Sequence, residues 1–136
     1  MDSLRSVRIE RVSTGEYVVH NARGDMLPVG GDNFTPVELL LAAIGTCTAI
    51  DTDVVTSRRA EPTGFTVTVS GDKVSDKESG NRMTNLSVTF DVTFPEGPAG
   101  DEARAVLPRT VRLSHDRLCT VSRTVELGTE VRTTIA

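Results

Sequence analysis

The sequence is poor in aromatic residues and in cysteine, and its basic residues are not concentrated in any one segment. Its 136 residues include no tryptophan, one tyrosine, four phenylalanines and two cysteines, with a formal net charge of −4. Proteins that bind single-stranded nucleic acid stack bases on aromatic side chains, and duplex binders present a positively charged stripe. Because the chain has neither feature, we expect no nucleic-acid partner.

The sequence pattern also shows no segment of the kind that crosses a membrane. The longest apolar run, residues 39–45, is far shorter than the ~20 residues that span a bilayer. Residues 1–11 are charged and lack the apolar stretch of a signal peptide. We therefore expect a cytoplasmic protein with no membrane partner.

Length and composition are typical of one soluble globular domain. Single domains usually contain roughly 100–200 residues, and the contents of 25% charged and 38% hydrophobic residues are ordinary for such a domain. A chain of this length buries enough surface to fold without a disulfide or a metal. We expect one domain over residues 1–136.

A helix start is the clearest local signal in the first half of the chain. Thr35 can serve as the N-cap, Pro36 occupies the first helical position, and Glu38 completes a capping box. The pattern predicts a helix from Pro36 to about Arg59, where arginines near the C-terminus favour the helix dipole. Its first half is apolar on all sides, which is typical of a helix buried at the centre of a molecule.

Alternating apolar and polar residues predict strands on both sides of this helix. The expected elements are two strands within residues 7–20, polar connections at 22–25 and 28–33, strands at 65–70 and 86–94, a helix at 101–113 kinked or broken by Pro108, a helix at 120–127 closed by Gly128, and a last strand at 129–135. This order predicts an α+β fold with antiparallel sheets around one long central helix.

Cys47 lies halfway along the predicted central helix. A stripe of Leu40, Ala43, Cys47, Ile50 and Val54 suggests that the thiol faces packed neighbours. A glycine inside a helix costs about 1 kcal/mol relative to alanine, so the preceding Gly-Thr pair indicates that a backbone or a ligand approaches closely. The alternative is a tight helix crossing in which the cysteine only fills space.

Cys119 directly precedes the predicted helix at 120–127. A thiol at a helix N-terminus has a lowered pKa because the positive end of the helix dipole stabilises the thiolate, and Arg117 and Arg123 would act in the same direction. The alternative is a small residue beside a helix cap with no redox role. His20 and His115 do not stand at zinc-ligand spacing from the cysteines, so no zinc site is expected.

Two further charged residues are candidates for a site around the cysteines. Arg23 belongs to a predicted turn before the long helix, where it is either an exposed turn residue or folds over the helix start. Glu38 is explained by the capping box alone, although its position near the start of the cysteine-bearing helix keeps it a candidate.

Residues 35–51, TPVELLLAAIGTCTAID, and residues 113–128, LSHDRLCTVSRTVELG, together resemble the OsmC/Ohr family of peroxide-detoxifying proteins. The resemblance implies an intertwined homodimer with active sites near the interface. It also implies reduction of organic hydroperoxides by a cysteine pair, reset by a dithiol reductant (lipoyl or similar), with no metal, flavin or haem cofactor. By position, Cys47 would be the peroxidatic thiol and Cys119 the resolving thiol.

The sequence departs from the family's better-characterised peroxidases at two positions. Those enzymes use an arginine from the first hairpin turn and a glutamate directly after the helix-start proline. Here the turn has no arginine and Val37 follows the proline, with Glu38 one place later. One residue turns a helical side chain by about 100°. The chain therefore resembles the broader OsmC-like branch, with Arg23 as the substitute arginine. An arginine near Cys47 would lower the pKa of its thiol and orient the peroxide.

Two functions follow from this resemblance and its departures. The first is a thiol peroxidase acting on alkyl or lipid hydroperoxides in oxidative-stress defence, with Cys47, Cys119, Arg23 and Glu38 as its site. The alternative is a non-enzymatic or weakly active dimeric module for redox sensing or binding. A cysteine hydrolase is disfavoured because such enzymes pair the thiol with a histidine base, and neither histidine is placed by sequence beside Cys47.

Overall fold

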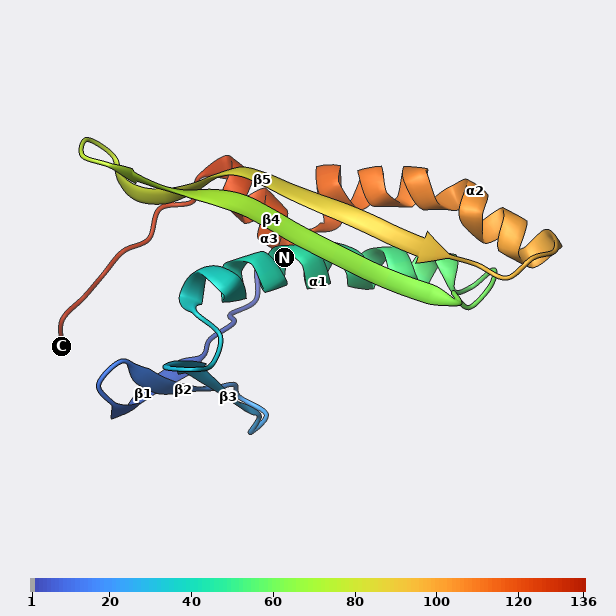
Figure 1. Cartoon of the computed structure of the whole chain (residues 1–136). Helices are drawn as coiled ribbons and strands as arrows, with labels where there is room; N and C mark the ends of the chain where they lie inside the picture. The colour runs from blue at the N-terminus through green and yellow to red at the C-terminus, as the bar shows by residue number, and fades with distance from the viewer. Residues whose placement is uncertain (1) are drawn as a thin grey trace. The chain divides into compact units, whose positions relative to one another are not determined.

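The computed structural model describes residues 2–136 as two compact units (Figure 1), one of residues 2–40 and one of Leu41–Ala136. The chain is of the α+β class with antiparallel sheets, as predicted. That residues 1–136 form a single domain stays a prediction, and Met1 lies outside the described residues.

The first unit contains a three-stranded antiparallel sheet. Its strands β1 (Arg8–Ser13), β2 (Glu16–His20) and β3 (Met26–Gly30) pair in the order β1-β2-β3. The predicted strand-turn-strand of β1 and β2 is confirmed, whereas β3 replaces part of a predicted connection and is a correction. Pro28 and the glycines after it disfavour a central strand, but β3 is an edge strand, where a proline is tolerated.

Helix α1 (Pro36–Thr56) begins with the predicted capping box. The Glu38 N–H donates to Thr35 Oγ1 at 3.1 Å, and the Thr35 N–H donates to Glu38 Oε1 at 2.9 Å. The helix ends before the predicted Arg59. That residue still stabilises the helix end, because its guanidinium donates to the Val55 carbonyl at 3.2 Å.

The buried face of α1 differs from the predicted stripe. Ile50 is 63% and Val54 51% exposed, whereas the buried residues are Ile44, Gly45, Thr48, Thr52 and Thr56. Apolarity alone selected the wrong face because neighbouring elements pack closely against the small residues instead. By length and composition α1 could also cross a membrane, a property that core helices of soluble proteins share.

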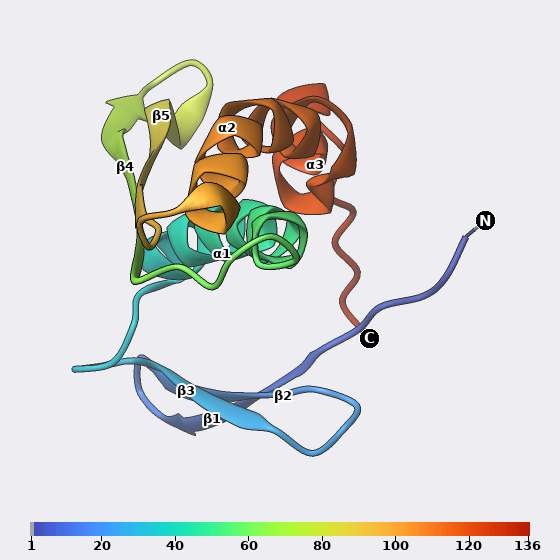
Figure 2. The same cartoon turned by 90° about the vertical axis from the view of Figure 1, so that its right-hand side faces the viewer.

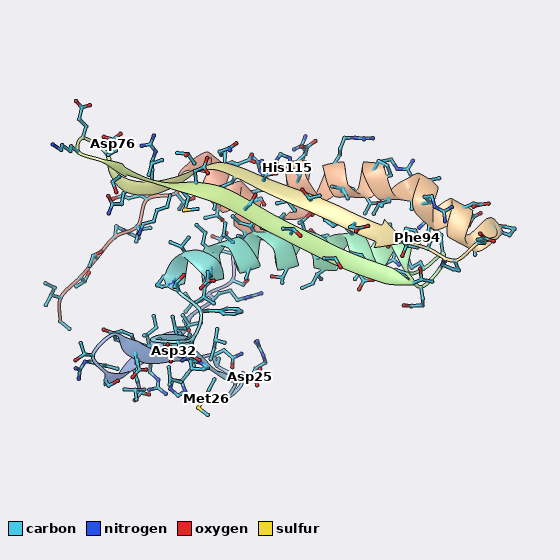
Figure 3. All side chains as sticks on the ribbon, in the orientation of Figure 1. Asp25, Met26, Asp32, Asp76, Phe94 and His115 are labelled. Atoms are coloured by element: carbon cyan, nitrogen blue, oxygen red, sulfur yellow. The ribbon has the colours of Figure 1, made fainter. Side chains whose placement is uncertain are left out.

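The second unit is built on a long antiparallel hairpin of β4 (Gly64–Asp76) and β5 (Gly80–Thr93). The predicted alternation is confirmed, and Phe65 and Phe90 pack edge-to-face with ring centroids 6.2 Å apart. Figure 3 marks Asp76 at the tip of the hairpin and Phe94 at its other end. Figure 2 shows α1 and α2 (Pro98–Leu113) beside each other against one face of this hairpin.

Helix α2 continues through Pro108, so the predicted break is wrong, whereas a kink at Pro108 stays a prediction. A proline removes one helical hydrogen bond, but the helix packs along buried Gly100, Ala103 and Thr110 on both sides of it. A π-helix (Ser114–Leu118) follows, and then α3 (Thr120–Leu127), which ends as predicted at Gly128 with φ 66°.

The predicted last strand is also wrong. Residues 129–136 have no regular structure and are exposed. Their alternating residues favour an extended chain, but a strand also needs an edge with which to pair, and none pairs with this segment within residues 2–136.

Candidate active site

The structure brings the two cysteines together within the unit of Leu41–Ala136. Cys47 lies on the middle of α1 and is partly buried, and Cys119 is fully buried at the start of α3. Cys47 and Cys119 are free thiols, and each shifts the pKa of the other, so the two side chains are neighbours. Two segments far apart in the sequence thus bring the two cysteines near each other.

Cys119 is the N-cap of α3. Its backbone is extended, with φ −71° and ψ 97°, and its sulfur accepts the Ser122 backbone N–H at 3.4 Å. The Ser122 hydroxyl lies 3.3 Å from the same sulfur. Burial raises the pKa of the Cys119 thiol, but the hydrogen bonds from Ser122 and Cys47 outweigh burial and leave that pKa below its ordinary value. The Cys119 thiol therefore loses its proton more readily than an ordinary cysteine. Arg123, which was expected to contribute to this shift, pairs with Glu126 at 2.9 Å.

The pKa of the Cys47 thiol is shifted in the other direction. Burial raises it most, and the hydrogen bond to Cys119 and the nearby Asp51 carboxylate raise it further, whereas the Val121 backbone N–H lowers it. This net rise is the opposite of the shift expected for a thiol beside an arginine. Of the two thiols, Cys119 has the lowered pKa and Cys47 the raised one.

The π-helix determines where Cys119 lies. The Cys119 N–H donates to the Ser114 carbonyl at 2.7 Å, a bond that spans five residues and closes the wide turn. The Ser114 hydroxyl, fully buried, lies 2.9 Å from Thr48 Oγ1 and 2.8 Å from Asp51 Oδ2. Sequence reasoning missed Thr48, Asp51 and Ser114. The available signal was a carboxylate, Asp51, one helical turn after Cys47 in a helix whose first half is mostly apolar.

A mostly apolar cavity of about 390 Å³ is lined by neighbours of the two cysteines, although neither cysteine lines it. It lies among α1, β5, α2, the π-helix and α3, and its lining comprises Ile44, Thr48, Leu86, Val88, Phe90, Val111, Arg112, His115, Ser122, Val125 and Glu126. Thr48 follows Cys47 in sequence, and Ser122 contacts Cys119. The cavity therefore extends to both neighbours of the thiols and is suited to an alkyl chain.

His115 lines this cavity and is marked in Figure 3. Its ring nitrogens lie 2.9 Å from Asp116 Oδ1 and 2.7 Å from Glu126 Oε1. Hydrogen bonds to Asp116 and then to Glu126 raise the pKa of the imidazole above its ordinary value. Both ring nitrogens are thus engaged with carboxylates, and the imidazole is not available to act as a base for a cysteine hydrolase.

Arg23 and Glu38 belong to the unit of residues 2–40. Arg23 lies in an exposed turn, where its backbone N–H donates to Asn21 Oδ1 at 3.0 Å. The Glu38 carboxylate accepts the Thr35 N–H of the capping box. Their roles toward Cys47 stay predictions. Within residues 2–136, no group of three or more histidine, cysteine or acidic side chains is arranged to hold a metal ion.

Comparison with known proteins places the chain in a family. The model of OsmC-like proteins matches residues 29–134, which include both cysteines. The chain belongs to the OsmC-like family. An uncharacterized protein of Mycobacterium tuberculosis is 32% identical over 131 residues, which cover 90% of each chain. The resemblance found in the sequence is thereby confirmed.

Solved structures agree with this assignment at the level of the fold. A hypothetical protein from Aquifex aeolicus superposes with a TM-score of 0.75 at 21% identity, covering 94% of this OsmC-like chain and 91% of the other. An OsmC-like protein of unknown function from Vibrio cholerae gives 0.71 at 15% identity, covering 92% and 95%. An organic hydroperoxide resistance protein OsmC from Legionella pneumophila gives 0.57 at 16% identity, covering 91% of both chains.

Proposed function

We propose that this OsmC-like protein is a thiol peroxidase that reduces organic hydroperoxides. The observation that carries the proposal is that Cys47 and Cys119, from distant segments, are neighbours that shift each other's pKa near an apolar cavity. A disulfide needs its two sulfurs close together, and the pairing is supported by the mutual pKa shifts of the two cysteines. The name of the Legionella pneumophila neighbour, an organic hydroperoxide resistance protein, agrees with this chemistry.

The first step is the attack of the Cys47 thiolate on the distal oxygen of the hydroperoxide. The O–O bond breaks, the alcohol leaves with a proton, and Cys47 becomes a sulfenic acid. In the second step, the Cys119 thiolate attacks the Cys47 sulfur, and hydroxide leaves as water after gaining a proton. The lowered pKa of Cys119 suits this step, because the attacking group is a thiolate. A dithiol reductant, lipoyl or similar, then reduces the disulfide.

The cavity determines the substrate class that we propose. Its walls are mostly Leu, Val, Ile and Phe side chains, and burying a CH₂ group from water contributes about 0.8 kcal/mol. An alkyl or lipid hydroperoxide gains this contribution, whereas hydrogen peroxide does not. We therefore propose a preference for organic hydroperoxides.

The remaining parts of the proposal concern the assembly and the charged residues. A cytoplasmic homodimer is proposed, because apolar residues of α1 such as Ile50 and Val54 are exposed in the single chain. Arg23 is proposed to stabilise the Cys47 thiolate and orient the peroxide, since a guanidinium presents paired donors. Glu38 is proposed to support that arginine.

Peroxide consumption by the reduced protein tests the proposed function. We expect tert-butyl hydroperoxide to be consumed faster than hydrogen peroxide and one equivalent to convert the chain to an intramolecular Cys47–Cys119 disulfide. Cys119→Ser should react once and then remain a sulfenic acid or over-oxidise to the sulfinic form. Cys47→Ser should react far more slowly. If both single variants keep turning over peroxide, the two-cysteine mechanism is wrong.

A second candidate function is a redox-sensing or binding module with little turnover. The raised pKa of the Cys47 thiol favours it, because a smaller thiolate fraction slows attack on a peroxide. The pH dependence of Cys47 alkylation in a Cys119→Ser variant separates the two candidates. A midpoint below the ordinary thiol value of ~8.5 supports the peroxidase, and a midpoint at or above it supports the module.

A further inference from the structure

A buried chain of hydrogen bonds connects α1 with the π-helix. The Ser114 hydroxyl is fully buried and lies 2.8 Å from Asp51 Oδ2 and 2.9 Å from Thr48 Oγ1. A carboxylate only accepts, and a serine hydroxyl has a single proton. Ser114 is the donor toward both Asp51 Oδ2 and Thr48 Oγ1, so its single proton is shared between the two acceptors on α1.

These hydrogen bonds lie next to both cysteines in the fold, but none of them involves a sulfur atom. Thr48 follows Cys47 directly, and Asp51 lies one helical turn after it on α1. The backbone carbonyl of Ser114 accepts the Cys119 N–H at 2.7 Å. A single residue is thus bonded through its side chain to the turn of α1 that carries Cys47, and through its backbone to Cys119.

We propose that Ser114 and Asp51 are positioning residues that hold Cys119 against the turn of α1 bearing Cys47. A hydrogen bond to a charged group contributes more than one between neutral groups, and no water replaces it at a fully buried hydroxyl. The inference rests on the proposed function in one respect, which is that the two thiols react with each other. It requires no particular peroxide.

The equilibrium between the protein and oxidised glutathione tests the positioning role directly. The two thiols and one oxidised glutathione give the Cys47–Cys119 disulfide and two reduced glutathiones, so the equilibrium constant measures how well the cysteines are held together. We expect Ser114→Ala to lower this constant by about tenfold, the effect of one hydrogen bond to a charged group.

Thr110→Ala is the matched control. Thr110 is also buried and lies one helical turn before Ser114, but its hydroxyl donates to the Val106 carbonyl of its own helix at 2.8 Å. Thr110→Ala removes a buried hydroxyl without breaking a bond to α1. The equilibrium constant of this variant with oxidised glutathione should therefore stay within about twofold of wild type. If Ser114→Ala does not fold, Asp51→Ala removes the acceptor from a partly exposed position with the same tenfold expectation.

Asp51→Asn adds a readout that a purely structural role would not move. Asparagine still accepts the Ser114 hydroxyl but has no charge. The groups that raise the pKa of the Cys47 thiol are Cys119, at the start of α3, and Asp51, on α1 itself, in addition to burial. In a Cys119→Ser background, Asp51→Asn should therefore shift the midpoint of Cys47 alkylation to lower pH.

The outcomes separate this inference from the proposed function. Unchanged constants in Ser114→Ala and Asp51→Ala, or a loss equal to that in Thr110→Ala, would overturn the positioning role and leave the peroxidase proposal standing. An unshifted alkylation midpoint in Asp51→Asn would also count against it. If the wild-type chain forms no Cys47–Cys119 disulfide with oxidised glutathione, the proposed function fails first.

Discussion

At the scale of single residues, the buried side-chain hydroxyl of Thr52 makes no hydrogen bond within the described residues. Its Oγ1 has no partner within the described residues 2–136, and the side chain is fully buried on α1. Valine has the same shape without the hydroxyl, so Thr52→Val removes an unsatisfied polar group. We expect the free energy of unfolding to rise by about 1 kcal/mol, as measured by urea denaturation.

Thr56→Val is the control for this substitution. Thr56 is equally buried on the same helix face, but its hydroxyl donates to the Thr52 carbonyl at 3.1 Å. Its replacement loses a hydrogen bond and should not stabilise the protein. Equal effects of the two substitutions would contradict the argument from Thr52.

His115 should make stability depend on pH. Hydrogen bonds to Asp116 and Glu126 raise the pKa of the folded imidazole above its ordinary 6.5. The stabilisation is therefore complete below the unfolded pKa and is lost as the pH rises through the folded value. The hydrogen bond to His115 lowers the pKa of Glu126. The stabilisation from Glu126 is therefore lost at acid pH, as the pH falls through this lowered pKa.

We expect His115→Gln to destabilise the protein more at about pH 6 than at about pH 9. The side chain is 54% exposed, so solvent screening keeps the difference small. Chemical denaturation of both proteins at the two pH values measures it. A difference that grows toward pH 9 would contradict the assigned direction.

At the scale of elements, Gly45 determines how closely α1 and β4 approach each other. A Cβ at this position would lie 2.6 Å from Val69 Cγ2 on β4. Alanine would favour the helix by about 1 kcal/mol, but overpacking of this kind costs about 1–3 kcal/mol. We expect Gly45→Ala to lower the free energy of unfolding. The neighbouring Thr46 already carries a Cβ, so its substitution by alanine adds no atom that could be overpacked.

Val69→Ala is the partner substitution in a double-mutant cycle. It removes the methyl group that the new Cβ would meet, so the double variant should be more stable than the sum of the single effects predicts. Additive effects would show that the contact between Gly45 and Val69 is not the constraint.

The elements that the sequence predicted correctly have local signals. The capping box of Thr35 and Glu38 and the terminal Gly128 act within one helical turn, and both appear in the structure. Strand β3 and the absent strand at 129–135 could not be predicted in this way. Whether an extended segment becomes a strand depends on an edge contributed by a distant segment.

The same distinction applies to the candidate site. The position of Cys119 at a helix start followed from adjacent residues, but its pairing with Cys47 was implied only by the family resemblance. The bond between Ser114 and Asp51 joins residues 63 positions apart. No periodicity or spacing in one sequence indicates such a pair, so the positioning residues emerged only from the structure.

At the scale of the whole molecule, the exposed apolar face of α1 underlies the proposed homodimer. Ile50 is 63% and Val54 51% exposed. We expect light scattering at micromolar concentration to give twice the chain mass of 14.6 kDa. Ile50→Glu should dissociate or unfold the assembly, because a carboxylate would be buried without a partner.

Leu127→Glu is the control for that substitution. Leu127 is more exposed than Ile50, at 72%, but lies at the end of α3. It should leave the mass unchanged. A stable, folded wild-type monomer at micromolar concentration would exclude the proposed homodimer.

The π-helix at Ser114–Leu118 makes the number of residues between Ser114 and Cys119 matter more than the identity of residues 115–118. Each residue advances an α-helix by about 100°, and a π turn accommodates one residue more than an α turn. Removing one residue from 115–118 would restore the α-helical phase and rotate Cys119 by about 100° away from α1. Related sequences should thus vary in side chains here while keeping a fixed count between Ser114 and Cys119.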